Sequence, residues 1–573
     1  MTFLKTAKMC TTGVAAALCL SGPTLAETTD AGAYLAARQA GIGGDYSAAA
    51  AYFQHALIAD PNNPVLIQQT LTAYLGSGQV ETAAAIGRTF TASGGDSQVA
   101  NMAIMAQAAR SGNWGTIFDM LEAGHEVGPL LDGLGQAWAF VGLGQMDRAL
   151  ASFDEVADTP GLRNFGQQHK AMALTIMGEL EAAEAIYSLP PNEGIVPTRG
   201  SVSAHLQILC RLGQFDKARG IVTRAFGSDM DPEIAELRDA IEAGQIPRLD
   251  NTVSNPAEGL AYAFKSLSDI LQGEANESYL LLYAQAARHI APQDADTHIA
   301  AARLLNALEQ YNDAAVTFAQ VSTEDPAYHS AELGRAEALR LDGQHDKAIE
   351  VLTQLTRSHP DLPLAHASLG DVFRQQSNYA AANSAYDAAL EANDADTSIR
   401  WWLLYSRGMT HERLDQWDAA EADFRAALDL NPGNPSILNY LGYSLVDRGM
   451  KFDEAVTMIE TAAEARPDSG AIIDSLGWAY YKLGRYEDAV GPMERAVELA
   501  PNDPVISDHL GDVYWKVGRE VEARFQWARA LSFGPSDEDA DRIRRKLNLG
   551  LDAVYAEEGV DLEPAVEVAN DAN

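Results

Sequence analysis

The sequence PGNPSILNYLG at residues 432–442 returns with small changes as PDSGAIIDSLG at 467–477 and as PNDPVISDHLG at 501–511. Each stretch begins with a proline and ends with a glycine ten positions later. Because proline cannot continue a helix, it marks the end of one helix and the turn before the next. The near-constant interval between Pro432, Pro467 and Pro501 therefore indicates a repeated unit built from short helices.

The same period extends toward the N-terminus. The prolines that mark it are Pro292, Pro326, Pro360, Pro432, Pro467, Pro501 and Pro535, and Ser398 takes the place of one proline in the long gap after Pro360. Small residues follow ten positions later, at Ala302, Ala336, Gly370, Gly442, Gly477 and Gly511, and alanines follow 22 positions later, at Ala314, Ala348, Ala382, Ala489 and Ala523. Small side chains at such positions let two antiparallel helices approach closely.

This pattern resembles the tetratricopeptide repeat (TPR), a pair of antiparallel helices that stacks on its neighbours and recurs every ~34 residues. We expect an all-α solenoid of about 12–14 helix pairs that forms a right-handed superhelix. The period is regular in the C-terminal half and degenerate upstream, where turns such as Gly76-Ser77-Gly78-Gln79 still mark the repeats. The expected divisions are a signal peptide (1–26), an N-terminal degenerate TPR solenoid (27–228), an irregular joint (229–257), a C-terminal TPR solenoid (258–535), a capping helix (536–551) and an acidic disordered tail (552–573).

The segment 1–26 has the features of a secretory signal. Lys5 and Lys8 precede a short apolar run, and Thr24-Leu25-Ala26 provides small residues for cleavage. We expect export to the periplasm and no membrane span in the mature chain, and an uncleaved N-terminal anchor stays open as the alternative. Leu18, in place of a small residue, precedes Cys19, and this does not favour a lipid anchor.

Composition argues against several functions. The chain has a net charge of −39, whereas nucleic-acid binding needs a basic surface. Two of its three cysteines lie in the signal segment, so that Cys210 alone remains and cannot form an intrachain disulfide. We found no motif for a nucleophile, a phosphate-binding loop or a zinc site. The sequence therefore predicts no catalytic residue, no metal and no cofactor.

Binding is expected on the concave face, which the first helix of each TPR lines. If position 1 lies three residues after the proline, positions 2, 5, 9, 12 and 13 tend to face inward. The candidate groove residues are Trp402, Tyr405, Met409, Asn439, Tyr443, Asp474, Trp478, Tyr481, Asp508, Asp512 and Trp515. Aromatic residues dominate binding hot spots, although an aromatic stripe can equally belong to the core, and both interpretations stay open. Position 5 is acidic in Asp474 and Asp508, where chaperone-tail receptors are basic.

Residues 437–518 also resemble a family of large bacterial envelope TPR proteins. The likeness lies in runs such as LNYLGY at 438–443, IIDSLGW at 472–478 and HLGDVYW at 509–515. That family includes the lipoprotein adaptor of a periplasmic carboxyl-terminal processing protease. The resemblance implies a non-catalytic scaffold that binds proteins or extended peptides, including a protease and its substrates in peptidoglycan-hydrolase turnover. The alternative is a cell-wall or exopolysaccharide assembly factor that binds glycan or secretion components. The oligomeric state stays undetermined.

Overall fold

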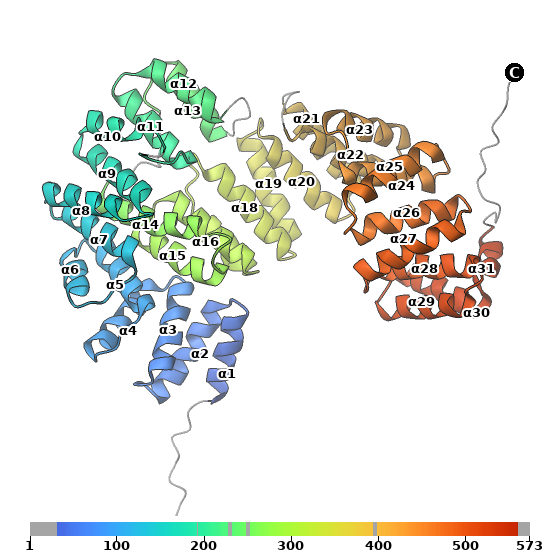
Figure 1. Ribbon diagram of the computed structural model, residues 1–573, viewed down its shortest axis with the longest axis horizontal. Helices are drawn as coiled ribbons and strands as arrows, with labels where there is room; N and C mark the ends of the chain where they lie inside the picture. The colour runs from blue at the N-terminus through green and yellow to red at the C-terminus, as the bar shows by residue number, and fades with distance from the viewer. Residues whose placement is uncertain (1–30, 192, 227–231, 248–252, 394–397, 560–573) are drawn as a thin grey trace, which may run out of the picture. The chain divides into compact units, whose positions relative to one another are not determined.

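The structure, a computed structural model, describes residues 31–191, 193–226, 232–247, 253–393 and 398–559 (Figure 1). Within these ranges the regular structure is α-helical, apart from one isolated bridge between Gln272 and Ala275. The expected all-α solenoid is thereby confirmed. The expected signal peptide lies outside the described residues.

Apart from the gaps given above, the described residues fall into two compact units, 31–225 with 235–334 and 226–234 with 335–559. The division falls within α18 (Tyr328–Leu341). The helices before it are α1 (Ala31–Ile42), α2 (Tyr46–Ala59), α3 (Pro64–Gly76), α4 (Val80–Ala92), α5 (Gln98–Arg110), α6 (Gly115–Glu122), α7 (Pro129–Gly142), α8 (Met146–Asp158), α9 (Arg163–Met177), α10 (Leu180–Tyr187), α11 (Arg199–Arg211), α12 (Phe215–Phe226), α13 (Pro232–Glu242), α14 (Pro256–Ile270), α15 (Glu277–Ile290), α16 (Ala295–Ala307) and α17 (Tyr311–Phe318).

The second unit continues the pairs and ends in two additional helices. Its helices are α19 (His345–Ser358), α20 (Pro363–Gln375), α21 (Tyr379–Glu391), α22 (Arg400–Arg413), α23 (Trp417–Leu430), α24 (Pro435–Asp447), α25 (Phe452–Ala465), α26 (Gly470–Lys482), α27 (Tyr486–Leu499), α28 (Pro504–Lys516), α29 (Glu520–Ser532), α30 (Asp537–Leu549) and α31 (Leu551–Glu558). In the described part of the chain, six pairs run from α1 to α12 and eight from α14 to α29, which agrees with the expected 12–14.

The small residues of the repeat lie where the two helices of a pair cross. A Cβ atom added to Gly442 would lie 2.7 Å from Cγ1 of Ile459, and one added to Gly511 would lie 2.4 Å from Cδ1 of Trp527. The partner alanines, such as Ala489 and Ala523, are fully buried. A larger side chain at either position would push the helices apart, and this is the physical reason for the sequence pattern.

Helix starts in the second unit follow from local chemistry. The side chain of Asn434 accepts hydrogen bonds from the backbone N–H groups of Ser436 and Ile437, and Asp503 does the same for the first turn of α28. A proline follows each capping residue, at the first helical position, where no backbone donor is needed. These caps fix where the first helices α24 and α28 begin.

The expected joint at 229–257 does not separate the two units. The helices that follow it, α14 to α17, belong to the first unit: α14 packs on α7, α5 and α9, and α15 packs on α5 and α3 (Figure 1). Gly259 stands against Trp138, where an added Cβ would lie 2.4 Å from the indole ring. The Gln285 amide donates to the Gly76 carbonyl at 3.0 Å. The repeat period predicts contacts between neighbouring repeats. It does not predict that α14 and α15 pack on helices far earlier in the sequence.

The C-terminal boundary also differs from expectation. The acidic stretch placed in a disordered tail from 552 begins with α31, in which Val554 and Tyr555 are buried. Two of its carboxylates, Glu557 and Glu558, pair with arginines of α30, and Arg542 lies 3.2 Å from Glu558. Asp552 pairs with Lys516 of α28. Acids that look like tail residues in the sequence are thus neutralised by the preceding helices. Residues 560–573 of the expected tail lie outside the described residues.

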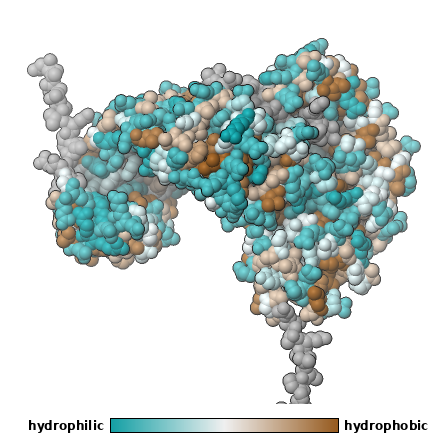
Figure 2. Space-filling view, turned by 180° about the vertical axis from the view of Figure 1, so that it is seen from behind, coloured by the Kyte–Doolittle hydropathy of each residue, from teal (hydrophilic) through white to brown (hydrophobic). Residues whose placement is uncertain are grey.

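The surface face in Figure 2 is largely hydrophilic, with apolar residues scattered over it. Across the part of the chain that the structure describes, none of the helices is both long and apolar enough to cross a membrane.

Candidate functional site

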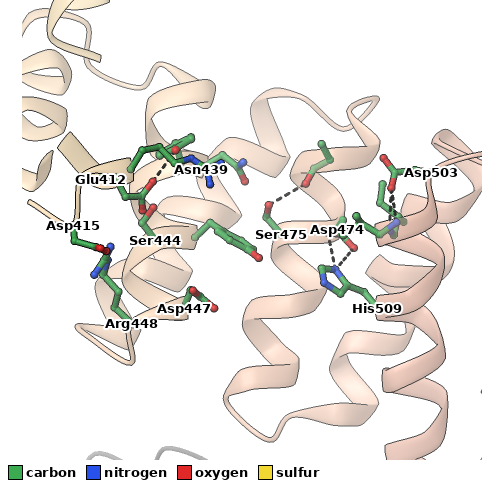
Figure 3. Close-up of a pocket in the computed structure, with 16 residues that line it drawn as sticks. Glu412, Asp415, Asn439, Ser444, Asp447, Arg448, Asp474, Ser475, Asp503 and His509 are labelled. Carbon is green, nitrogen blue, oxygen red and sulfur yellow. Dashed lines mark hydrogen bonds and ion pairs between the residues drawn. The ribbon is translucent and has the colours of Figure 1, made fainter. Parts of the chain in front are cut away.

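A pocket of about 600 Å³ lies between the first helices of four consecutive pairs in the second unit, α22, α24, α26 and α28 (Figure 3). Because these helices are consecutive in the stack, the pocket extends across repeats and is lined by residues about one repeat apart. The lining residues are Glu412, Arg413, Asp415, Asn439, Tyr440, Tyr443, Ser444, Asp447, Arg448, Ala471, Asp474, Ser475, Asp503, Val505, Ile506 and His509. We call this the groove pocket.

The groove pocket carries an excess of negative charge. Five of its lining residues are carboxylates, Glu412, Asp415, Asp447, Asp474 and Asp503, against two arginines and one histidine. Burial raises the pKa of Tyr443 to about 12, and three neighbouring carboxylates add to the shift. The shift itself reflects mainly burial, whereas the excess of carboxylates over basic side chains gives the pocket a negative potential, which favours cations.

Three of the predicted groove residues, Asn439, Tyr443 and Asp474, line the groove pocket. Figure 3 shows Asn439 and Asp474 extending from neighbouring helices toward the same space. Tyr443 is half-buried, so that part of its ring is available to a ligand.

Trp402, Tyr405 and Met409 of α22 lie outside the pocket. All three are partly buried against the core between α20 and α26. The ring of Tyr405 meets that of Tyr440 edge-on at 5.9 Å between centroids. Much of the area that these residues could offer a partner is therefore already used in packing within and between neighbouring repeats.

Trp478 and Tyr481 are core residues in the structure, which is one of the two interpretations that the sequence left open. Their exposed fractions are 8% and 6%, and their rings stack at 4.7 Å. The other neighbour of Trp478 is His509, whose ring stacks at 3.9 Å. Burial by itself would lower the pKa of His509, but the Asp474 carboxylate, 3.0 Å from its Nδ1, outweighs burial and raises the pKa. His509 thus separates the pocket from Trp478 in the core, and its raised pKa favours the protonated form.

Asp508, Asp512 and Trp515 of α28 are engaged by the C-terminal helices. Lys546 of α30 is fully buried, with its Nζ 2.7 Å from Asp508 and 2.8 Å from Asp512. The Trp527 indole also donates to Asp512, at 2.9 Å. Burial and the Asp512 carboxylate raise the pKa of Asp508, which Lys546 opposes. This end of the groove is filled by the chain itself.

α31 completes the closure of that end. The Trp515 indole donates to Asp552 at 3.0 Å, and the hydroxyls of Tyr481 and Tyr555 lie 3.0 Å apart. In the first unit, α14 and α15 likewise cover the first helices α3, α5, α7 and α9.

Sequence reasoning missed several residues of these surfaces. Lys546 and Tyr555 lie beyond the last repeat, where the period gives no position to assign. Arg448, Asp503 and His509 line the pocket from turns and from a helix position outside the inward set. The signal that could have found His509 is its place beside Asp508 and one repeat after Asp474. Within the described residues no group of histidine, cysteine and carboxylate side chains is arranged to hold a metal ion.

Stacked pairs whose first helices form a groove define a helical-repeat scaffold for protein interactions. Family models of the tetratricopeptide repeat match residues 305–372, 367–435, 405–450 and 441–504. Residues 305–504 therefore carry tetratricopeptide repeats.

Two curated relatives match part of the chain. The chain is 30% identical over 156 residues to the TPR repeat-containing protein PA4667 of Pseudomonas aeruginosa, a match to 27% of this chain and 26% of that protein. It is 27% identical over 179 residues to human tetratricopeptide repeat protein 13, covering 30% of this chain and 20% of that protein. The chain thus spans about a quarter or less of the length of these relatives.

Solved structures with similar folds include the Cut9 and Hcn1 hetero-tetramer of the APC/C, with a TM-score of 0.38 and 15% identity over 91% of this chain and 96% of that chain. A MamA structure has a TM-score of 0.26 and 23% identity over 29% of this chain and 96% of that chain.

Proposed function

We propose that this protein is a non-catalytic periplasmic scaffold that binds a segment of another protein in the groove pocket and presents that protein to a carboxyl-terminal processing protease. The observation that carries the binding role is the pocket itself, which is a hollow across four first helices. Most of its polar lining residues are exposed or half-buried, whereas Ser444, Asp474 and Ser475 are buried. The corresponding helices α3, α5, α7 and α9 are covered by α14 and α15, and the end of α28 by α30 and α31.

The periplasmic location and the protease are supported by sequence alone. Lys5, Lys8 and the apolar run after them are the features of an export signal. The repeats in 437–518 resemble those of the envelope adaptor family, and the match to the Pseudomonas aeruginosa protein is a bacterial one.

Glycan binding is less well supported by the geometry. Sugars stack on open aromatic faces, whereas the faces of Trp478 are covered by Tyr481 and His509. Tyr443 is the aromatic candidate that lines the pocket and keeps part of its ring uncovered.

A bulky residue in the pocket tests the proposed function. Ala471 lines the pocket and is exposed, so that Ala471→Trp would fill the space without entering the core. Ala422 is also exposed, on α23 and outside the pocket, and Ala422→Trp is the matched control. We expect the full chain and the control to enrich the same proteins from a periplasmic extract, including a protease, and Ala471→Trp to lose them. Equal enrichment by all three chains would contradict the pocket as the binding site.

A further inference from the structure

Lys546 shows how this groove accommodates a cation. The residue projects from α30 onto α28, and none of its side chain is exposed. Its ammonium group lies between two carboxylates, 2.7 Å from Asp508 and 2.8 Å from both oxygens of Asp512. A buried ammonium is tolerated only where charged partners surround it in this way. Helix α30 is thus an internal ligand of the groove, with Lys546 as the contact residue.

The groove pocket has the same kind of lining earlier in the stack. Asp474 lies one repeat before Asp508 and occupies the corresponding place on α26. In this repeat His509 partners the carboxylate, at 3.0 Å, in the absence of a lysine from the chain. The groove therefore has an acidic residue at the same position in two successive repeats, Asp474 and Asp508. Lys546 of α30 supplies the cation for Asp508.

Three of the four remaining pocket carboxylates, Glu412, Asp447 and Asp503, are only partly neutralised. Glu412 accepts one hydrogen bond from the Tyr440 hydroxyl at 2.7 Å. Asp447 lies 3.5 Å from Lys482 and its side chain is 58% exposed. One oxygen of Asp503 caps α28. Each of these groups keeps at least one carboxylate lone pair for a donor from outside.

We propose that the groove pocket binds a lysine- or arginine-bearing segment of a partner protein, whose cation enters the acidic groove as Lys546 does at its closed end. This inference rests on the proposed function and names its ligand class. The volume of about 600 Å³ exceeds that of one side chain, so that the partner contributes a short run of residues. The net charge of −39 steers basic partners toward the protein and raises their association rate.

The test uses the full chain and a peptide of four Ala-Ala-Lys repeats labelled with fluorescein, with four Ala-Ala-Gln repeats as the uncharged counterpart. The pocket variant is Glu412→Gln with Asp447→Asn, in which Gln still accepts from Tyr440. The matched control is Glu464→Gln with Asp429→Asn, which removes the same charge from exposed positions on α25 and α23. Circular dichroism and melting temperature establish that both variants fold.

We expect anisotropy titrations to give a Kd for the lysine peptide that rises about tenfold in the pocket variant and less than about twofold in the control. The glutamine peptide should not bind measurably to the natural chain or to either variant. Equal weakening in both variants would mean that the acidic chain attracts the peptide generally, and this overturns the inference. Stronger displacement by calcium chloride than by sodium chloride at equal ionic strength would assign the carboxylates to a metal and also overturns it.

The two proposals can fail separately. If Ala471→Trp loses its protein partners while the pocket variant binds the lysine peptide as tightly as the natural chain does, the binding role stands and the cationic ligand class is wrong. If Ala471→Trp keeps its partners, the proposed function is wrong whatever the peptide does.

Discussion

At the residue scale, Lys546 holds the last turns of the chain in place. Replacing it with methionine keeps the length of the side chain but leaves Asp508 and Asp512 without their cation. Removing one partner of a buried ion pair typically costs about 3–5 kcal/mol. We expect Lys546→Met to abolish hydrogen-exchange protection in α30 and α31 and to lower the melting temperature of the second unit.

Lys516→Met is the control for this prediction. Lys516 pairs with Asp552, whose side chain is 54% exposed, so that the pair should contribute no more than about 1 kcal/mol. Equal loss of protection in both variants would show that the burial of Lys546 has no special role.

Trp478 decides between the core and the groove interpretations of the aromatic stripe. Because it is 8% exposed and stacked on both faces, Trp478→Ala should destabilise the second unit by about 3–5 kcal/mol. Val505 also lines the pocket but is 48% exposed, and Val505→Ala should change stability by no more than about 0.5 kcal/mol. Chemical denaturation of each variant measures the difference, and a stable Trp478→Ala protein would return this residue to the binding surface.

Asp294 gives the first unit a pH dependence. Burial, and then the neighbouring Asp296, raise its pKa from 3.8 to about 7. A carboxyl whose folded pKa is raised stabilises the fold below the unfolded pKa, and this contribution is lost as pH rises through the folded pKa. Asp294→Asn keeps the cap that accepts from the Asp296 backbone N–H and removes the titration.

We therefore expect Asp294→Asn to gain stability relative to the natural chain as pH rises from about 4 to 7, with little further change above. Thermal melts across this range measure the difference. A constant difference between the two chains would contradict the raised pKa.

At the scale of the element, some turns between paired helices hold a residue other than glycine in the strained left-handed backbone conformation. Most turns between paired helices place a glycine in the left-handed region, as Gly343 does at φ 74°, whereas Ser377 adopts φ 58° in the same kind of turn. A residue with a Cβ atom loses about 1 kcal/mol in this conformation. We expect Ser377→Gly to raise the stability of the second unit by up to about 1 kcal/mol and Gly343→Ala to lower it by a similar amount. A lower melting temperature for Ser377→Gly, or a higher one for Gly343→Ala, would contradict this account of the turns.

How far the elements could be predicted depends on the range of the interactions involved. Gly442, Gly477 and Gly511 were expected at close helix crossings, and each faces a side chain where an added Cβ would collide. These are contacts within one repeat, and the period encodes them directly. Trp478 and Tyr481 occupy inward positions by the same rule, yet His509 and Tyr555 of later helices cover them. A single repeat carries no information about such later neighbours.

At the scale of the whole molecule, the same limit explains the misplaced domain boundary. The helices α14 to α17 keep the repeat period of the C-terminal half, and α14 and α15 pack on α3, α5, α7 and α9. Contacts such as that between Gln285 and Gly76, which lie far apart in the sequence, leave no periodic trace. Asn439, Tyr443 and Asp474 were expected at inward positions and line the pocket. Glu412, Asp447 and Asp474 supply its negative charge from the first helices, while Asp415 and Asp503 add to it from turns that the inward positions do not include.

The central claim is that the groove pocket of α22, α24, α26 and α28 holds a segment of a partner protein. A photo-crosslinking amino acid at position 471, inside the pocket, and at position 422, outside it, tests this claim in the living cell. The account predicts a discrete protein adduct from position 471 on irradiation and none from position 422. Adducts from neither position, or the same adducts from both, would contradict it.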